Sequence, residues 1–501
     1  MPAAPQGSLG ATATGVAASG LRTSLAWIIG LLLPCSLGLA AEPSAFLSLH
    51  PANPHYFRWR GNPTVLVTSG EHYGAVLNLD FDYVAYFQEL QRHGLNHTRV
   101  FSGVYREDPS AFGITQNTLA PRAGRFICPW ARSEQPGYHA GGNRFDLTKW
   151  DPAYFDRLKE FLTQAGKHGI VVELTLFCPM YRDEMWHDSP MHSGNNVNHL
   201  GDCGREEVYT GQHPELMQVQ LAVTRKIVAE LREFDNLYYE ICNEPYFGGV
   251  TMPWQRAIAD AIVEVEREFP QPHLISQNVA NGRQKIEQPY PAVSIFNFHY
   301  CVPPDTVAMN YDLHKVIGEN ETGFRGPEDI LYRTEAWDFL LAGGGLFNNL
   351  DYSFTAQHPR GTLRDYRSPG GGSVELRRQL GVVKQFLESF DFLRLQPSPH
   401  LIRRVTPELT ASLLSEPGRA YAVYLHVPLP EKPKPLSDHL RDGIEASLEL
   451  ALPSGEYTVE WIDPETGNIS RADRLDHASS TAELKSPRFN NDIAIRLKRV
   501  K

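Results

Sequence analysis

Asn236-Leu-Tyr-Tyr-Glu-Ile-Cys-Asn-Glu-Pro245 is the stretch on which the prediction of the fold depends. Its aromatic and β-branched residues predict a short strand over 237–242, and Pro245, which cannot donate to a sheet ladder, ends that strand. Asn243 and Glu244 therefore stand at the end of a strand. An amide beside a carboxylic acid suits a site in which one group holds a substrate hydroxyl and the other transfers a proton. We then expect a second carboxylate at another strand end.

Length and composition indicate a large globular domain with a smaller companion. The chain has 501 residues, more than one hydrophobic core usually serves. Hydrophobic residues make up 42% and charged residues 21% of it, which is the balance of a globular protein. The net charge of -11 argues against nucleic acid as a partner, because nucleic acid selects a basic patch. A neutral or sugar-like substrate fits this charge better.

Residues 1–41 have the layout of a secretory signal peptide. Arg22 precedes an apolar run over 25–33, and the small residues Gly38, Ala40 and Ala41 follow the run. The run is shorter than the roughly 20 apolar residues of a membrane span. Cys35 follows a proline, which departs from the pattern of a lipoprotein cleavage site. We expect a secreted or periplasmic protein without stable membrane insertion after signal removal, and lipid anchoring is the lesser alternative.

Export implies a compartment in which disulfides can form. Removal of Cys35 with the signal leaves an odd number of cysteines, namely Cys128, Cys178, Cys203, Cys242 and Cys301. At least one of them is therefore expected to be free or paired outside the chain. None belongs to a Cys-x-x-Cys pair, which excludes zinc-ribbon and thioredoxin-type sites.

Strand and helix patterns alternate through the first four fifths of the chain. Apolar runs predict eight strands, over 64–68, 95–100, 170–177, 237–242, 273–277, 293–298, 313–317 and 345–350. Short strands that are apolar on both faces are typical of a buried parallel sheet. Eight strand–helix repeats then predict a closed (β/α)8 TIM barrel over residues 42–395. A doubly wound sheet is the alternative, but Ser69-Gly70-Glu71-His72 is not the glycine-rich turn that it would need.

Polar residues gather where the predicted strands end, and this end of a barrel carries the active site. Long loops over 102–146 and 179–211 follow the second and third strands, and loops of this length usually line or cover a site. The second loop contains several histidines and acids, which could indicate a metal site. Their spacing does not match a metal-binding motif, so we expect a polar loop over a cleft and no metal or cofactor.

After residue 395 the period of the apolar residues changes to two. The segment 395–400, with two prolines, is expected to be a linker. Five short strands are predicted beyond it, over 409–414, 421–427, 446–452, 457–463 and 493–497. They indicate a small β-sandwich over 400–501 that either binds a ligand or covers a flank of the barrel.

A partner for Glu244 must come from a strand on the other side of the barrel, and the seventh strand offers Glu319 and Glu321. Cleavage of a glycosidic bond requires such a pair, one acid to protonate the leaving oxygen and one carboxylate at the anomeric carbon. Asn243-Glu244-Pro245 and Glu321-Thr322-Gly323 resemble the acid/base and nucleophile motifs of clan A glycoside hydrolases, most closely the cellulase-like family 5. The resemblance assigns the nucleophile to Glu321, and Glu319 is the alternative.

The resemblance extends over residues 57–393 and implies further roles. Arg99 matches the arginine that hydrogen-bonds the nucleophile and keeps it ionised, and His299-Tyr300 matches a His and Tyr pair near the carboxylates. The protein would be a retaining glycoside hydrolase of a poly- or oligosaccharide, with carboxyl groups about 5 to 5.5 Å apart and no cofactor. The sequence departs from the family at Cys178, where many members have histidine, and in the eighth strand, which lacks the usual tryptophan.

The remaining candidate residues are expected to bind the substrate. Tyr181, Trp186 or Tyr352 could replace the missing tryptophan as a stacking surface, and His72 is expected at the site because it follows the first strand. Asn243 would hold a sugar hydroxyl. Two alternatives stay open: a non-catalytic carbohydrate-binding protein on a degenerate barrel, and a metal-dependent hydrolase that uses the histidine loop.

Overall fold

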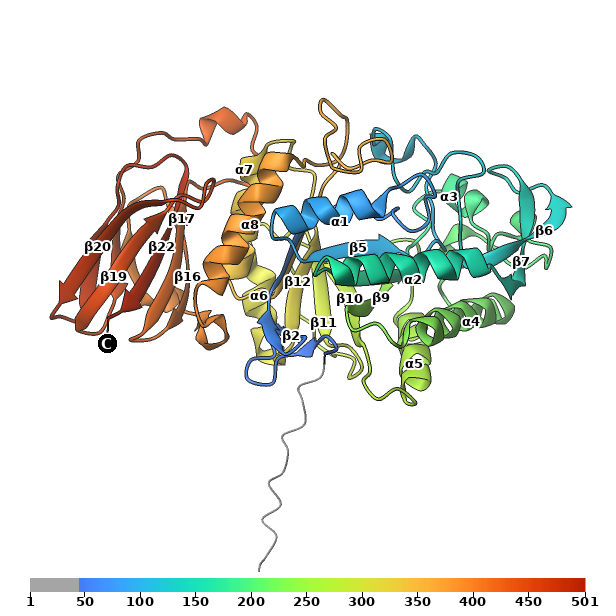
Figure 1. Cartoon of the computed structure of the whole chain (residues 1–501), viewed down its shortest axis with the longest axis horizontal. Coiled ribbons are helices and arrows are strands. Elements are labelled where there is room, and N and C mark those ends of the chain that lie inside the picture. Colours follow the sequence, from blue (N-terminus) through green and yellow to red (C-terminus); the bar gives the residue numbers. More distant parts are fainter. Residues whose placement is uncertain (1–44, 501) are drawn as a thin grey trace, which may run out of the picture. The chain divides into compact units, whose positions relative to one another are not determined.

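The computed structural model describes residues 45–500, so the predicted signal peptide lies outside the described residues. Eight parallel strands form its central sheet (Figure 1). In chain order they are β4 (Leu66–Gly70), β5 (His97–Phe101), β8 (Val171–Phe177), β9 (Leu237–Cys242), β10 (Leu274–Asn281), β11 (Ile295–His299), β12 (Val316–Glu321) and β13 (Leu346–Leu350). Consecutive strands pair in parallel from β5 through β13, and β13 pairs with β4, which confirms the predicted barrel.

Asn96 closes the ring between β4 and β5. Its backbone N–H donates to the carbonyl of Val67 at 3.2 Å, and its side-chain amide donates to the carbonyl of Val65 at 2.9 Å. Its Oδ1 accepts the backbone N–H of Val67 at 3.0 Å. One asparagine thus satisfies backbone groups that an open sheet edge would leave without partners.

A small antiparallel sheet packs against the N-terminal ends of the barrel strands. It consists of β1 (Ser48–Leu49), β2 (Phe57–Trp59) and β3 (Asn62–Thr64). Phe57 and Trp59 share a buried cluster with the first residues of five barrel strands, Leu66, Val171, Ile295, Val316 and Leu346. Apolar side chains therefore fill this end of the barrel, and the C-terminal end is left for polar groups.

Helices follow most of the barrel strands. They are α1 (Tyr83–Arg92), α2 (Pro152–Lys167), α4 (Pro214–Leu231), α5 (Met252–Glu266), α6 (Asp305–Asn310), α7 (Asp329–Leu341) and α8 (Val374–Glu388). Asp82, Asp151, Thr251 and Ser373 begin four of them, because each side chain accepts a backbone N–H of the first turn. The expected repeat fails once, since the connection 282–294 between β10 and β11 contains no helix.

The two long loops contain structure that the sequence patterns do not predict. The loop after β5 includes an antiparallel hairpin of β6 (Trp130–Pro136) and β7 (Asn143–Trp150). The loop after β8 includes the short helix α3 (Asp183–Asp188). Figure 1 shows β6, β7 and α3 together at one end of the barrel.

The C-terminal residues form a sandwich of a six-stranded and a three-stranded sheet. The larger sheet has the order β14 (Gln396–Pro397), β16 (Thr410–Glu416), β17 (Ala420–His426), β22 (Asp492–Arg499), β19 (Gly455–Ile462), β20 (Ile469–His477), and the smaller has the order β15 (Ile402–Val405), β18 (Ser447–Ala451), β21 (Thr481–Lys485). The sequence predicts five of these strands but not β14, β15, β20 or β21. The expectation of a linker over 395–400 is wrong, because β14 lies within it and pairs with β16.

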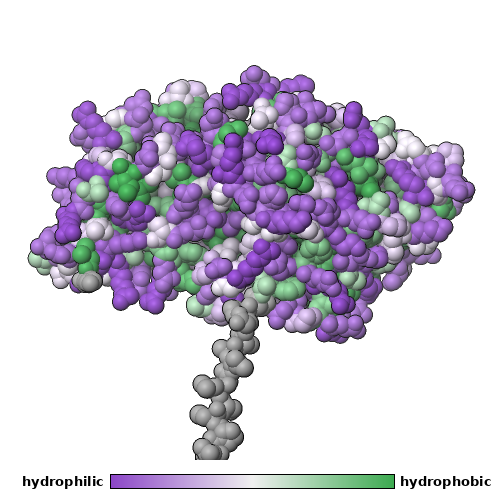
Figure 2. All heavy atoms as spheres, in the orientation of Figure 1, coloured by the Kyte–Doolittle hydropathy of each residue, from purple (hydrophilic) through white to green (hydrophobic). Residues whose placement is uncertain are grey.

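The helices within residues 45–500 include no candidate membrane span. None of the helices there is both long enough and apolar enough to cross a bilayer. The face drawn in Figure 2 is mainly hydrophilic, with apolar residues scattered over it.

All five cysteines of the described part are free thiols, where the sequence requires at least one. Cys128, Cys178, Cys242 and Cys301 are buried. Burial raises the pKa of the Cys128 thiol to about 12. A thiol in such surroundings stays protonated and unreactive near neutral pH.

Candidate active site

A cavity of about 230 Å³ lies at the C-terminal ends of the barrel strands. Of the ten residues predicted for the site, seven line this cavity: His72, Tyr181, Asn243, Glu244, Tyr300, Glu321 and Tyr352. Arg99 and His299 lie behind its wall and contact the two glutamates. Only Trp186 of the ten lies elsewhere.

Glu244 follows β9 with a φ of 36°, a backbone conformation that few residues other than glycine adopt. Its Oε2 accepts a hydrogen bond from the Tyr181 hydroxyl at 2.6 Å, and its Oε1 accepts one from the Tyr246 hydroxyl at 3.2 Å. Burial raises the pKa of Glu244, but hydrogen bonds from His299 and the tyrosines outweigh burial and leave the pKa below its ordinary value. Backbone strain at an acid surrounded by donors is typical of a functional site.

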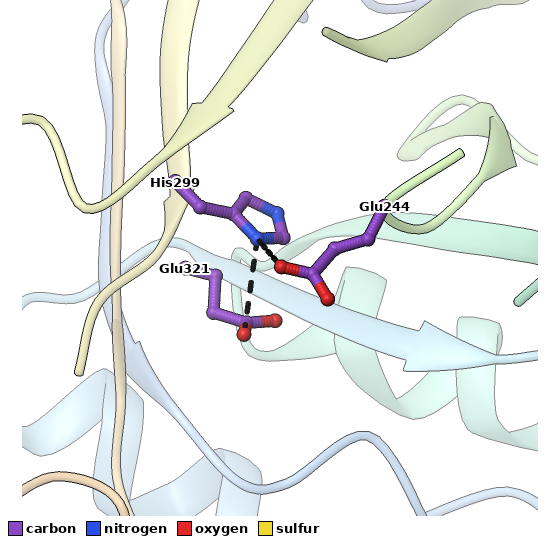
Figure 3. A group of neighbouring side chains, drawn as sticks. All are labelled: Glu244, His299 and Glu321. Carbon is purple, nitrogen blue, oxygen red and sulfur yellow. Dashed lines mark hydrogen bonds and ion pairs between the residues drawn. The ribbon is translucent and has the colours of Figure 1, made fainter. Parts of the chain in front are cut away.

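His299, the last residue of β11, is buried beside Glu244. Its Nε2 lies 2.6 Å from the amide nitrogen of Asn278, and its Nδ1 lies 3.1 Å from Oε1 of Glu244. When the Asn278 amide donates to Nε2, the ring proton is on Nδ1 and is donated to Glu244. Nδ1 is also 3.8 Å from Glu321, so the imidazole lies between the two acids (Figure 3).

Glu321 is the last residue of β12, and both of its carboxylate oxygens accept hydrogen bonds. Oε1 accepts one from the Tyr300 hydroxyl at 2.5 Å. Oε2 accepts one from the Tyr73 hydroxyl at 2.7 Å and one from Nη1 of Arg99 at 3.3 Å. These three donors hold the carboxylate in one orientation, which a nucleophile positioned for attack requires.

Glu244 and Glu321 approach each other at the cavity wall (Figure 3). One carboxylate oxygen of each and Nδ1 of His299 all lie within 4.8 Å of one another. Three such atoms could ligate a metal ion, but here tyrosine hydroxyls already occupy lone pairs of both carboxylates. The Arg99 guanidinium adds a positive charge beside Glu321. The arrangement therefore suits two carboxyl groups acting on a substrate better than a cation site.

Arg99 is fully buried in β5 and connects three strands of the barrel. Its Nε donates to Glu240 at 3.1 Å, and its Nη2 donates to Glu240 and, at 2.6 Å, to Oδ1 of Asn243. The ring of Tyr73 lies over the guanidinium, 4.6 Å away. Since Glu240 and Asn243 belong to β9 and its end, Arg99 fixes the position of Glu321 relative to the Asn243-Glu244 pair.

Asn243 and Tyr181 form a hydrogen-bond chain that ends on Glu244. The Asn243 amide nitrogen donates to the Tyr181 hydroxyl at 2.9 Å and contacts Sγ of Cys178 at 3.5 Å. The Tyr181 hydroxyl in turn donates to Glu244. Cys178, where the family often has histidine, therefore lies against this chain rather than against the carboxylates.

Glu107 is a residue of the cavity wall that the sequence patterns do not reveal. It accepts hydrogen bonds from the Asn117 amide at 2.5 Å and the Tyr105 hydroxyl at 3.1 Å, and lies 3.3 Å from Nε2 of His72. Burial lowers the pKa of His72, but the Glu107 carboxylate outweighs burial and raises it overall. The pair supplies a hydrogen-bond donor and an acceptor at the cavity wall.

Residues with positive φ, most of them aromatic, surround the cavity. Five residues of its wall have this conformation, namely Tyr73, Phe112, Glu244, Tyr300 and Phe324. Tyr73 lies in the polar cluster after the first strand, which is the only signal in the sequence for its contact with Glu321. Phe112 and Phe324 are exposed by 45% and 53%, and their loop positions carry no motif.

Trp186 does not line the cavity, so a stacking role there is not supported. Its side chain is buried under the loop after β8, where Nε1 donates to the carbonyl of Cys203 at 2.8 Å and the ring packs against His192. The tryptophan thus stabilises that loop. Tyr181 and Tyr352 remain as stacking candidates in the cavity.

Glu319 lies outside the cavity, although it is two residues from Glu321. Its Oε1 accepts the backbone N–H of Cys301 at 2.6 Å. Burial and the neighbouring carboxyl of Glu335, on α7, raise the pKa of Glu319 well above its ordinary value. The register of β11 and β12 shifts at this point, since Phe298 pairs with Glu319 and His299 pairs with Glu321.

Fold and site together define a (β/α)8 barrel with two acids facing each other where its strands end. No protein-family model matches the sequence, and a search of curated proteins finds no relative. Two solved structures from Bacteroides vulgatus have the same fold. One, assigned to the glycoside hydrolases, is 14% identical with a TM-score of 0.64, and the match covers 92% of this chain and 83% of that chain. The other, a glycoside hydrolase family 5 protein, is 12% identical with a TM-score of 0.59, and the match covers 91% of this chain and 94% of that chain. At this identity the similarity shows the fold, that of family 5, and it includes the C-terminal sandwich.

Proposed function

We propose that the protein is an exported glycoside hydrolase that cleaves β-glycosidic bonds of a poly- or oligosaccharide by a retaining, double-displacement mechanism. The observation that carries the proposal is the approach of Glu244 and Glu321, whose nearest carboxylate oxygens lie within 4.8 Å. Retaining enzymes hold their carboxyl groups about 5 to 5.5 Å apart, whereas inverting enzymes need roughly 6.5 to 9.5 Å to admit a water. The fold shared with family 5 structures supports the same reaction class.

In the first step a carboxylate oxygen of Glu321 attacks the anomeric carbon. Glu244 gives its proton to the glycosidic oxygen, the leaving group departs as an alcohol, and a glycosyl ester forms on Glu321. In the second step Glu244 removes a proton from water, which attacks the same carbon and releases Glu321. Arg99 and the Tyr73 and Tyr300 hydroxyls orient Glu321 throughout.

The hydrogen bonds to Glu244 influence the pH range in which the protein would be active. Its lowered pKa means that Glu244 loses the proton it must donate at a pH below the ordinary glutamate range. We therefore expect kcat/KM to be highest in acidic solution and to fall as the pH rises.

The test is Glu321→Ala, assayed with aryl β-glycosides of glucose, mannose, galactose and xylose. Loss of the nucleophile should lower turnover by about 10⁴-fold or more. Added azide should restore release of the aryl group and yield a glycosyl azide, because the small anion enters the space of the missing carboxylate. Wild-type protein that binds polysaccharide without turning over any glycoside would instead support the carbohydrate-binding alternative. Loss of wild-type activity in a strong chelator would support a metal-dependent hydrolase.

A further inference from the structure

A second hollow of about 340 Å³ adjoins the catalytic cavity. The two share Asn281, Tyr300 and Phe324 in their walls. Another part of the wall comes from the sandwich, which contributes Glu431 and Lys432 from the connection between β17 and β18. Small-molecule sites have volumes of roughly 300–1,000 Å³, so the hollow is large enough for a ring next to the cavity.

Arg325 fixes the sandwich connection at this place. Its Nε donates to the carbonyl of Glu431 at 3.3 Å, and its Nη2 lies 3.4 Å and 3.3 Å from the carbonyls of Leu429 and Pro430. Its own position is set by Nη1, which pairs with Glu335 at 3.1 Å. Because Arg325 is four residues beyond Glu321, the connection that follows β12 positions the sandwich connection beside the acid.

Phe324 forms the boundary between the two spaces. It is 53% exposed, has a φ of 59°, and its ring packs edge-on against Tyr300 at 5.3 Å. An exposed aromatic ring buries little apolar area, and a positive φ adds strain, so the residue contributes little to stability here. Such a ring is suited to stack against the apolar face of a sugar.

Glu431 and Lys432 have polar groups that are free to bind a ligand. Their side chains are about 60% exposed, and the ion pair between them is long, at 3.6 Å. An exposed pair of this kind contributes little to folding. The ammonium donates and the carboxylate accepts, which together match the hydroxyl groups of a neutral sugar.

We propose that this hollow is a second sugar-binding subsite, in which one ring of a neutral oligosaccharide stacks on Phe324 while Glu431 and Lys432 bind its hydroxyls. The proposal rests on the proposed function of the adjoining cavity, and it makes the sandwich part of the substrate-binding surface. The preferred substrate then has more than one sugar residue.

The experiment uses the full chain with Glu321→Ala, so that binding is measured without turnover. β-1,4-linked trisaccharides of glucose, mannose, xylose and galactose are titrated calorimetrically into it, with and without the double change Glu431→Ala and Lys432→Ala. We expect the double change to weaken binding of the preferred trisaccharide about tenfold. In the otherwise wild-type enzyme it should lower kcat/KM for that trisaccharide by a similar factor and leave kcat/KM for the aryl monosaccharide unchanged.

Lys434→Ala is the matched control, since Lys434 is exposed on the same connection but does not line the hollow. Equal affinity with and without the double change, or equal losses with Lys434→Ala, would overturn the subsite, as would failure of all four trisaccharides to bind. Binding that depends on Glu431 and Lys432 without turnover by the wild type would retain the subsite and reject the hydrolase. Turnover of the trisaccharide that the double change leaves unaltered would reject the subsite and retain the hydrolase.

Discussion

Glu319 and Glu321 show how the surroundings give two nearby acids different chemistry. Glu321 meets three donors at the cavity, whereas Glu319 meets one backbone N–H and the carboxyl of Glu335. Burial and the Glu335 carboxyl raise the pKa of Glu319 and favour its protonated form, which is a poor nucleophile. The contacts of the two acids therefore favour Glu321 over Glu319 as the proposed nucleophile.

Glu319→Gln tests this reading, because the amide resembles the protonated acid in shape and charge. We expect kcat/KM to change less than about threefold, against the large loss that a nucleophile shows. The contribution of Glu319 to wild-type stability should fall as the pH rises above the ordinary glutamate pKa, because the unfolded chain ionises there more readily than folded Glu319, whose pKa is raised. The melting temperature of the variant relative to wild type should thus increase from pH 5 to pH 8. A variant as inactive as Glu321→Ala would contradict the assignment.

Tyr181→Phe tests the control of the proton on Glu244. The change removes a 2.6 Å hydrogen bond that lowers the pKa of Glu244. A hydrogen bond to a charged group is worth about 1.5 kcal/mol, and 1.36 kcal/mol corresponds to one pKa unit, so the pKa should rise by about one unit. The alkaline limb of kcat/KM against pH should move upward by the same amount. Tyr209→Phe, which removes a hydroxyl without a hydrogen-bond partner, should not move it.

The sequence predicts residues that stand at strand ends, and it predicts Tyr181 from the loop after β8, but it misses other loop residues of the site. Glu244 and Glu321 follow apolar runs, so their place at one end of the barrel can be inferred. Glu107 could not be found in this way, because its position depends on how the long loop after β5 folds over the barrel. Phe324 lies in the short connection between β12 and α7, which carries no motif. Trp186 is misassigned because the direction of its ring is set by α3 and its loop.

At the scale of elements, an irregular register between β12 and β11 determines where the side chains at the end of β12 point. Asn320 donates to Glu173 and Glu240 in the barrel interior, so strict alternation would put Glu319 and Glu321 on the same outer face. The shift between Phe298 and His299 in the pairing with β11 breaks that alternation. Bulges beside active sites commonly redirect a side chain, and this one brings Glu321 to the cavity.

Gly318→Ala tests how closely β12 must pack to hold that geometry. A Cβ at Gly318 would lie 2.4 Å from Oδ1 of Asn297, so the strand or its neighbour must move. We expect a loss of about 1–3 kcal/mol in the free energy of unfolding and a marked loss of activity. Gly323→Ala, where the nearest atom is 3.5 Å away, should unfold like the wild type. Urea titrations of both variants make the comparison, and equal stabilities would refute it.

The elements that the sequence does not predict share a physical reason. β20 is exposed along most of its length, so it lacks the apolar alternation that identifies a half-buried strand. β14 is two residues long and contains a proline, which reads as a linker when its pairing with β16 is unknown. The barrel strands are predicted because burial on both faces leaves apolar runs in the sequence.

At the scale of the whole described chain, the sandwich is joined to the barrel by a buried interface. Leu414, Tyr424 and Ile462 belong to the same apolar cluster as the barrel helices. The ring of Tyr424 stacks on Trp337 of α7 at 5.0 Å. We therefore expect barrel and sandwich to unfold together, and a change that weakens the interface should separate the two transitions.

Arg333→Met is that change. Arg333 of α7 makes a bidentate pair with Asp492 of β22, at 2.9 Å on both oxygens, and both residues are buried. Removal of Arg333 leaves the buried Asp492 carboxylate without its ion-pair partner and with the Tyr424 hydroxyl, at 2.8 Å, as a remaining donor. Breaking a buried pair in this way costs about 3–5 kcal/mol. Urea unfolding followed by tryptophan fluorescence and by activity should coincide in the wild type and diverge in the variant. Arg404→Met, which breaks an exposed pair with Glu449, should cost less than about 1 kcal/mol. If the two variants lose equal stability, the interface is not held by the buried pair.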